Sequence, residues 1–213
     1  MNKTYVNILS YPRLKKPTLI VGLPEIGNIG EIVARLLIEF SHAELFAEIY
    51  SPSFPDLVNI DKKGLCRPPR YESYASGDSE NLIILTGDAQ PPLEDIPAHY
   101  EVCGEVLNLA RKFGCRFVIT VAGVPSEHPQ KEVYVAATSK RLAAEYLEKD
   151  AVIYKGGRIF GVSGLLLGLA KIRGLEGVCL LAPTLGLTAD QEAAFNVYRF
   201  LRKVLGTPIK EGL

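Results

Sequence analysis

A buried strand, a glycine-rich turn and an amphipathic helix follow one another within residues 17–40, and this succession constrains the fold more than any other feature of the chain. Residues 18–21 (TLIV) form a short apolar run, which is typical of a strand buried on both faces. From Ile29 to Phe40 the apolar side chains recur every three or four residues, which predicts a helix with one buried face. A strand that leads directly into a helix is the repeating unit of α/β proteins.

The turn between this strand and helix is the first candidate site, because the free N–H groups and dipole of a helix N-terminus attract anions. We expect Asn28 to cap the helix and Glu31 to complete a capping box. The turn has no lysine of the Walker type, it matches only the second half of a dinucleotide fingerprint, and Glu25 would repel a phosphate. Two interpretations remain open. The glycines permit a tight turn, or the loop binds an anionic small molecule through Glu25, Gly27, Asn28 and Gly30.

Strands and helices alternate along the rest of the chain. Apolar runs predict strands at residues 5–9, 43–50, 82–85, 116–122, 133–137, 153–154 and 177–182. Amphipathic patterns predict helices at residues 100–113 and 139–149, an almost wholly apolar run predicts a buried helix at residues 161–170, and a last amphipathic helix ends at Leu205. We expect Ser163 to cap the third of these helices, and Thr188 with Gln191 to form a capping box for the last. The alternation predicts one α/β domain over residues 1–213, with a mostly parallel or mixed sheet between two layers of helices.

Residues 51–80 interrupt this alternation, because they are rich in proline, serine and charged side chains. We expect them to form an irregular surface insertion that contains a hairpin, with strands at residues 58–60 and 66–74 around the turn at residues 61–64. Phe54, Tyr71 and Tyr74 are candidate interface residues, since aromatic side chains are enriched where proteins meet.

The charge balance excludes some classes of function. The chain has 24 Lys and Arg and 24 Asp and Glu, and no run of basic residues. A nucleic-acid-binding protein normally has a basic excess, so we expect no nucleic-acid partner. A surface with no net charge protects poorly against association, which favours a homo-oligomer.

Cysteine usage and hydropathy give further limits. The four cysteines, at positions 66, 103, 115 and 179, include no C-x-x-C pair, so we expect neither a metal site nor a cofactor held by them. The N-terminus lacks the pattern of a signal peptide, and no apolar run is long enough to span a bilayer. We therefore expect a cytoplasmic protein without a membrane partner.

No set of residues identifies a catalytic centre. Asp88 and His128 each follow a predicted strand, where open α/β sheets place their ligands. Asp88 would suit a metal or a ribose, but an aspartate after a glycine is also ordinary turn chemistry. The GVSG run at residues 161–164 is one residue short of a nucleophile elbow. We expect a binding protein rather than an enzyme. The alternative is a small-molecule enzyme with its ligand beside the glycine turn, Asp88 and His128.

Four segments together resemble the archaeal branch of the proteasome assembly chaperone 2 (PAC2) family. They are residues 18–39 (TLIVGLPEIGNIGEIVARLLIE), 81–91 (NLIILTGDAQP), 116–125 (RFVITVAGVP) and 161–170 (GVSGLLLGLA). The resemblance implies a phosphorylase/hydrolase-like α/β/α fold without a proven active site. It also implies self-association and, as in characterised members, help in assembling proteasome α-subunits.

The chain departs from this family at its last residues. Members that dock on the proteasome α-ring carry a C-terminal tail of a hydrophobic residue, a tyrosine and any residue, whereas this sequence ends Lys210-Glu211-Gly212-Leu213. The partner is therefore either the α-subunits or another assembling protein. We expect residues 51–74 and 125–129 to contact it.

Overall fold

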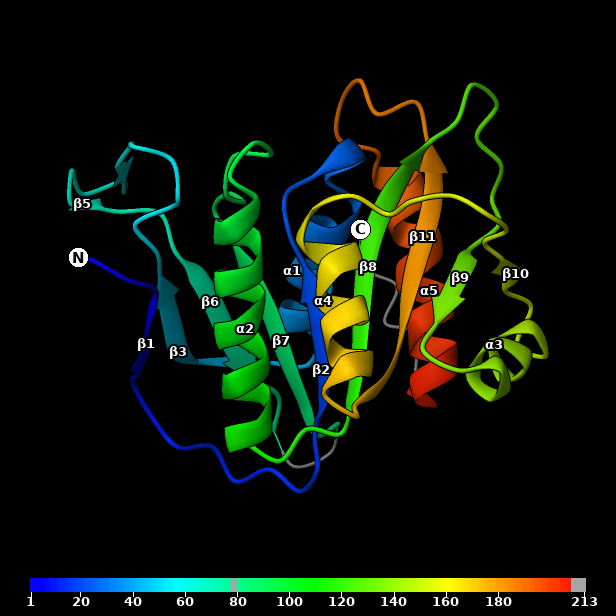
Figure 1. The fold of residues 1–213 in the computed structure, drawn as a ribbon, viewed down its shortest axis with the longest axis horizontal. Helices are drawn as coiled ribbons and strands as arrows, with labels where there is room; N and C mark the ends of the chain where they lie inside the picture. Colours follow the sequence, from blue (N-terminus) through cyan, green and yellow to red (C-terminus); the bar gives the residue numbers. More distant parts are fainter. Residues whose placement is uncertain (78–79, 208–213) are drawn as a thin grey trace.

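The computed structural model describes residues 1–77 and 80–207, which form a nine-stranded sheet with helices on both faces (Figure 1). The strand order is β1-β3-β6-β7-β2-β8-β11-β9-β10. These strands are β1 Tyr5–Ile8, β2 Thr18–Gly22, β3 Glu44–Tyr50, β6 Tyr71–Ala75, β7 Leu82–Gly87, β8 Phe117–Pro125, β9 Tyr134–Ala137, β10 Val152–Ile153 and β11 Glu176–Thr184. A separate hairpin pairs β4 (Asn59–Ile60) with β5 (Cys66–Arg67).

The centre of the sheet is parallel and most of its outer pairings are antiparallel. Strands β7, β2, β8 and β11 run in the same direction. Strands β6, β3 and β1 continue the sheet on one side in antiparallel pairs, and β9 pairs antiparallel with β11 on the other. The α/β class and mixed sheet expected from the sequence are thus confirmed. The four central strands all end at one edge, which we call the carboxyl edge.

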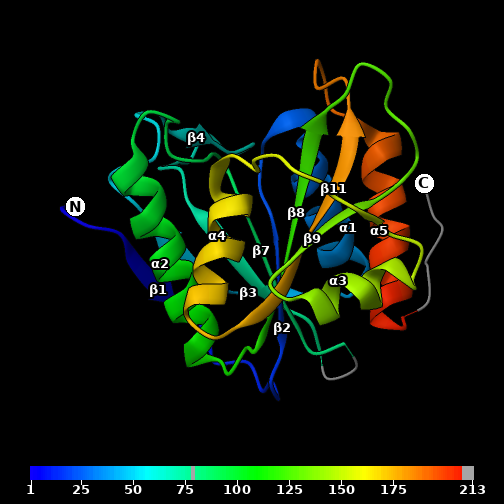
Figure 2. The same cartoon turned by 45° about the vertical axis from the view of Figure 1, so that its right-hand side comes forward.

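Helices cover both faces of the sheet (Figures 1 and 2). Helices α2 (Ile96–Lys112) and α4 (Gly161–Ile172) pack together on one face, and α1 (Ile29–Phe40) and α5 (Gln191–Leu205) pack together on the other. The short helix α3 (Lys140–Leu147) lies against β9 and β10. Within residues 1–77 and 80–207, none of the helices has both the length and the hydropathy needed to cross a bilayer.

Strand β2 shows why an uninterrupted apolar run marks the centre of such a fold. Leu19 and Val21 enter the core under α2 and α4, whereas Ile20 enters the core under α1 and α5. All three are at most 2% exposed. Burying an aliphatic side chain of this size contributes roughly 1.5–3 kcal/mol, so the strand holds both helical layers to the sheet.

The caps expected for α1 and α5 are wrong. Asn28 does stand at the N-cap of α1, but its backbone is left-handed (φ 50°, ψ 21°) and its side chain makes no capping hydrogen bond. A capping side chain normally needs an extended backbone at that position. Glu31 pairs with Arg35 one turn later instead of completing a capping box. Helix α5 begins at Asp190, whose carboxylate accepts from the Ala193 N–H, rather than at the expected capping box.

The segment at residues 51–80 is more regular than expected. The hairpin around residues 61–64 is present, and the Asp61 carboxylate holds its turn by accepting from the N–H groups of Lys63 and Leu65. Residues 71–75, however, are β6, which lies between β3 and β7 inside the main sheet. The expectation of an irregular insertion therefore fails there. The sequence predicted a strand over residues 66–74 but assigned it to the hairpin, because YESYA carries polar side chains that are unusual inside an otherwise apolar sheet.

Candidate docking site at the carboxyl edge

The loops that leave the central strands gather at the carboxyl edge (Figure 1). They are residues 23–28 after β2, 88–95 after β7, 126–133 after β8 and 185–190 after β11. The stretch that leads into α4 and the β4–β5 hairpin lie at the same edge. Most of the site residues predicted from the sequence are in these loops. In the part of the chain that the structure describes, however, no hydrogen bond or ion pair joins Asp88 or the exposed His128 to the glycine turn.

Close packing against the ends of β8 and β11 accounts for the glycines of the turn. Gly27 has a left-handed backbone (φ 68°), and a Cβ there would lie 3.1 Å from the Thr184 side chain. A Cβ on Gly30 would lie 2.5 Å from the carbonyl oxygen of Val121, which no real side chain tolerates. The Asp190 N–H donates to the carbonyl of Gly27 at 2.9 Å. This geometry supports the interpretation that the glycines permit a tight, densely packed turn.

Glu25 and Gln90 tie the turn to the start of α4. The Ser163 hydroxyl donates to Glu25 Oε1 at 2.5 Å, across 138 residues of sequence. Gln90 donates through Nε2 to the carbonyl of Pro24 at 3.0 Å and accepts through Oε1 from the Val162 N–H at 2.9 Å. We call Glu25, Gln90 and Ser163 the edge clamp. The expectation that Ser163 caps α4 is wrong, because Phe160 is the N-cap and the Ser163 hydroxyl is engaged by Glu25.

Burial changes the acidity of Glu25. Desolvation raises the pKa of this carboxyl from its usual 4.5 to about 7, although the hydrogen bond from Ser163 lowers it in part. Burial also raises the pKa of Tyr71 and of Cys179, and the nearby charge of Glu25 adds to both shifts. Glu25 therefore changes charge near neutral pH in surroundings of neutral side chains.

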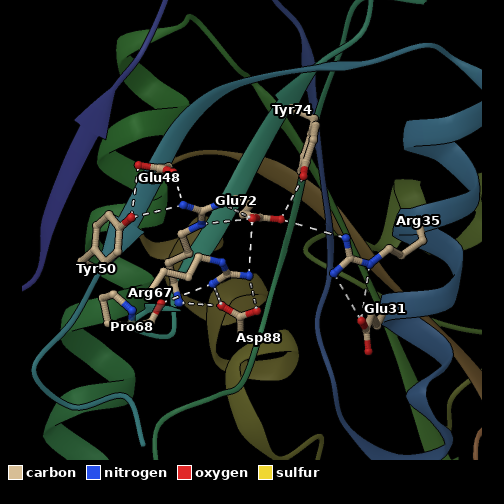
Figure 3. A network of polar contacts seen from close by, with 10 residues as sticks. Glu31, Arg35, Glu48, Tyr50, Arg67, Pro68, Glu72, Tyr74 and Asp88 are labelled. Carbon is tan, nitrogen blue, oxygen red and sulfur yellow. Dashed lines mark hydrogen bonds and ion pairs between the residues drawn. The ribbon is translucent and has the colours of Figure 1, made fainter. Parts of the chain in front are cut away.

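Asp88 serves to anchor the hairpin (Figure 3). Its two carboxylate oxygens accept from the Arg67 guanidinium at 2.5 and 2.9 Å, and one of them also accepts from the Arg70 N–H at 2.9 Å. Although burial disfavours its charge, these hydrogen bonds hold the pKa of Asp88 below its usual value. Arg67 closes β5 and Asp88 follows β7, so the ion pair fastens the hairpin to the carboxyl edge. Among the described residues, no three His, Cys, Asp or Glu side chains are grouped to hold a metal ion.

The ion pair continues into a polar network on the face of β3 and β6 (Figure 3). Glu72 accepts from Arg70 at 2.7 Å and from the Tyr74 hydroxyl at 2.9 Å, and Arg70 also pairs with Glu48. Arg35 of α1 reaches Glu72 at 4.0 Å. Helix α1 packs on β2, β7 and β8 and leaves this part of the same sheet face to the network. Tyr74 is only partly buried there and remains a candidate interface residue.

Phe54 and Tyr71 do not lie on the surface, which contradicts the expectation that they form an interface. Tyr71 is fully buried, Phe54 is 8% exposed, and their ring centroids are 4.8 Å apart. Both belong to the core under α2 and α4. The signal that suggested an interface, aromatic residues among polar ones, arises here because Tyr71 lies on a sheet strand with polar neighbours.

Ten exposed apolar side chains lie at the carboxyl edge. Four of them are within residues 51–74, where the sequence predicted a contact, and the other six were not predicted. We call all ten the apolar rim, and they are Ile26, Leu57, Val58, Ile60, Leu65, Leu93, Ile96, Phe160, Leu185 and Leu187. Phe160 is 73% exposed and Leu187 is 86% exposed. Exposed apolar side chains grouped in this way are typical of surfaces that bind proteins, membranes or ligands. One sequence signal could have predicted the rim. Its apolar residues lie in or beside stretches rich in glycine and proline, which lack the periodic pattern of a buried strand or helix.

Comparison with known proteins gives concordant matches. The PAC2 family model matches residues 19–212. The crystal structure of PbaB from Pyrococcus furiosus, an archaeal proteasome activator, is 38% identical with a TM-score of 0.93, and the match covers 99% of this chain and 92% of that one. PbaA from the same organism, an archaeal homolog of proteasome-assembly chaperone, is 29% identical with a TM-score of 0.81, covering 96% and 83%. The uncharacterized protein MJ1210 of Methanocaldococcus jannaschii is 33% identical over 184 residues, which are 85% of this chain and 70% of that protein.

Proposed function

This chain belongs to the PAC2 family, and from that premise we propose that it is a proteasome assembly chaperone-like protein that self-associates and binds proteasome α-subunits. It acts in the cytoplasm and offers a preformed surface to an incompletely assembled partner. By shielding apolar surface on that partner, it suppresses aggregation until the correct neighbours arrive.

The apolar rim is the observation that carries this proposal. Most of its side chains come from loops at the ends of the central strands and from the hairpin that the Arg67–Asp88 ion pair holds. A surface held in place before binding loses little conformational entropy on contact. Full burial of one large aliphatic side chain contributes roughly 1.5–3 kcal/mol, so a few rim residues suffice for reversible capture. The loop at residues 125–129 stays part of the proposed contact, and residues 210–213, which carry the departure from the family tail, lie outside the described residues.

Native mass spectrometry of the protein mixed with proteasome α-subunits from the same source tests the proposal. We expect the wild-type chain to capture α-subunits, and the double variant Phe160→Ser with Leu187→Ser to lose at least tenfold in affinity. Both side chains are largely exposed, so the variant should keep its thermal midpoint. Ile172→Ser is the matched control, since Ile172 is 82% exposed but ends α4 at the opposite edge.

Two results would contradict the proposal: no capture by the wild-type chain, or equal loss in the rim variant and the control. A retained small molecule in the same spectra would instead favour the enzyme alternative. A separate outcome concerns proteasome activation, which the similarity to PbaB makes a second candidate function. Increased peptidase activity of an already assembled proteasome, without any effect on α-subunit assembly, would support activation.

A further inference from the structure

One face of the β4–β5 hairpin is apolar and open to solvent. Ile60 of β4 lies opposite Cys66 of β5 in the register, so the two side chains are on the same face. Val58 and Pro68 are two positions further along, and the alternation of side chains in extended backbone places them on this face as well. All four residues are exposed, and Ile60 is 61% exposed. We call these four residues the hairpin face.

The opposite side of the hairpin is fastened to the rest of the molecule. Arg67, which follows Cys66 on β5, binds Asp88, and the side-chain nitrogen of Asn59 on β4 is buried. At the other end, the Asp61 carboxylate fixes the turn. In the part of the chain that the structure describes, β4 and β5 make extensive contact only with each other, and Figure 1 shows the hairpin to one side of the helices. The hairpin face is therefore held in place and directed outward.

We propose that the hairpin face is the surface through which two copies of this chain associate, with the two faces packed against each other about a two-fold axis. The inference rests on the proposed function in one respect, namely that the chain self-associates. It leaves the rim residues outside residues 51–74 free to hold α-subunits. An isolated two-stranded hairpin is marginally stable in water, so burial of its open face also stabilises the hairpin itself.

Charge favours a second copy as the occupant of this face. The hairpin face has no ionisable Lys, Arg, His, Asp or Glu side chain, so two copies meet there without repulsion. Lys62 and Lys63 lie at the tip of the hairpin and Asp56 lies at its base, and none of these three takes part in an ion pair within residues 1–77 and 80–207. A two-fold axis places the tip of one hairpin over the base of the other, so the lysines of each copy face Asp56 of the other. Exposed pairs of this kind add little affinity, but they favour one relative direction of the two hairpins.

The size of the hairpin face determines the expected strength of association. Stable protein interfaces usually contain about 20–30 residues on each side, and this face supplies only four together with their neighbours. Association should therefore be reversible, with a dissociation constant in the micromolar range. We expect the wild-type chain to change from single copies to pairs as its concentration is raised through that range.

Sedimentation velocity over a series of concentrations tests the inference, with a matched pair of variants from the same hairpin. Ile60→Ser should raise the dissociation constant about tenfold or more, because a two-fold contact loses the same side chain from both copies. Leu65→Ser is the control and should stay within about twofold of wild type. Leu65 is 65% exposed, as much as Ile60, but it precedes Cys66 and therefore lies on the other face. Because both side chains are exposed, both variants should keep the wild-type thermal midpoint.

Cys66 gives a second measurement, because it lies on the hairpin face and is exposed, whereas Cys103, Cys115 and Cys179 are buried. A short bismaleimide forms a thioether with each of two thiols and should link Cys66 of one copy to Cys66 of the other. We expect a covalent pair in the wild-type chain and none in Cys66→Ser. At the same concentration, Ile60→Ser should give much less of the covalent pair although it keeps the thiol.

The inference is overturned if Ile60→Ser and Leu65→Ser have equal effects on association, or if the bismaleimide links no copies of the wild-type chain. It is also overturned if Ile60→Ser loses capture of α-subunits while association between copies is unchanged, since the hairpin face would then bind the α-subunit. Association that persists unchanged in Ile60→Ser would reject this face and leave the proposed self-association standing. Pairing through the hairpin face without any capture of α-subunits would reject α-subunit binding and leave the inference standing.

Discussion

One ion pair shows how strongly the stability of this fold can depend on a single charged residue. The Arg202 guanidinium on α5 is fully buried and pairs with both oxygens of Glu80 at 2.9 and 2.8 Å. Glu80 lies just before β7, so the pair fastens the end of α5 to the sheet. A buried ion pair contributes little compared with an apolar pair, but breaking it leaves a charge without compensation. Its importance is therefore visible only when one partner is removed.

Replacement of Arg202 by methionine should lower the free energy of unfolding by roughly 3–5 kcal/mol, because Glu80 then stays buried without its partner. Urea denaturation of the wild-type and variant chains measures this loss. The double variant Arg202→Met with Glu80→Gln removes both charges and should recover part of it. A loss below about 1 kcal/mol in the single variant would mean that the pair is not a structural contact.

At the scale of elements, hydrophobic periodicity predicts most of the sheet and helices, since burial of one face leaves a repeating pattern. It predicts a strand at β6 but not its place in the main sheet, where Glu72 is buried because Arg70 and Tyr74 satisfy its carboxylate. The edge clamp could not be predicted from the sequence either, since Glu25 and Ser163 are 138 residues apart and no local pattern pairs them. Tertiary hydrogen bonds of this kind become apparent only when the strands are placed in order.

The β4–β5 hairpin is an element whose position depends on one ion pair. Asp88→Asn should weaken the bidentate contact with Arg67 and loosen the hairpin, while the sheet stays folded. We expect limited proteolysis within residues 56–67 to become several times faster, with a global stability loss of about 1–3 kcal/mol. Asp56→Asn, an exposed substitution in the same segment, is the control. Equal cleavage rates in both variants would show that other contacts hold the hairpin.

For the whole molecule, the positions of the exposed apolar side chains say more about binding than the net charge does. Acidic and basic residues balance at 24 each, and ten of the eighteen exposed large apolar side chains in the described part of the chain belong to the apolar rim. A partner recognised by this rim is held by apolar burial rather than by long-range attraction between opposite charges.

Affinity for α-subunits should therefore depend weakly on ionic strength. We expect the dissociation constant to change by less than about threefold between about 50 and 500 mM salt, because screening acts on charges and leaves apolar contacts intact. Biolayer interferometry across this range measures it. A weakening of tenfold or more would place the contact on the charged network around Arg70 and Glu72 instead of the apolar rim.

The order of strands in the sheet also determines when the chain can fold. Strand β2 pairs with β8 from about a hundred residues further along, and β8 gains its other neighbour only when β11 has been made. During synthesis, β2 and β8 consequently cannot complete their pairing until most of the polypeptide has emerged from the ribosome. A protein proposed to shield unfinished assemblies thus passes through an unfinished state of its own, in which its apolar strands are exposed to aggregation.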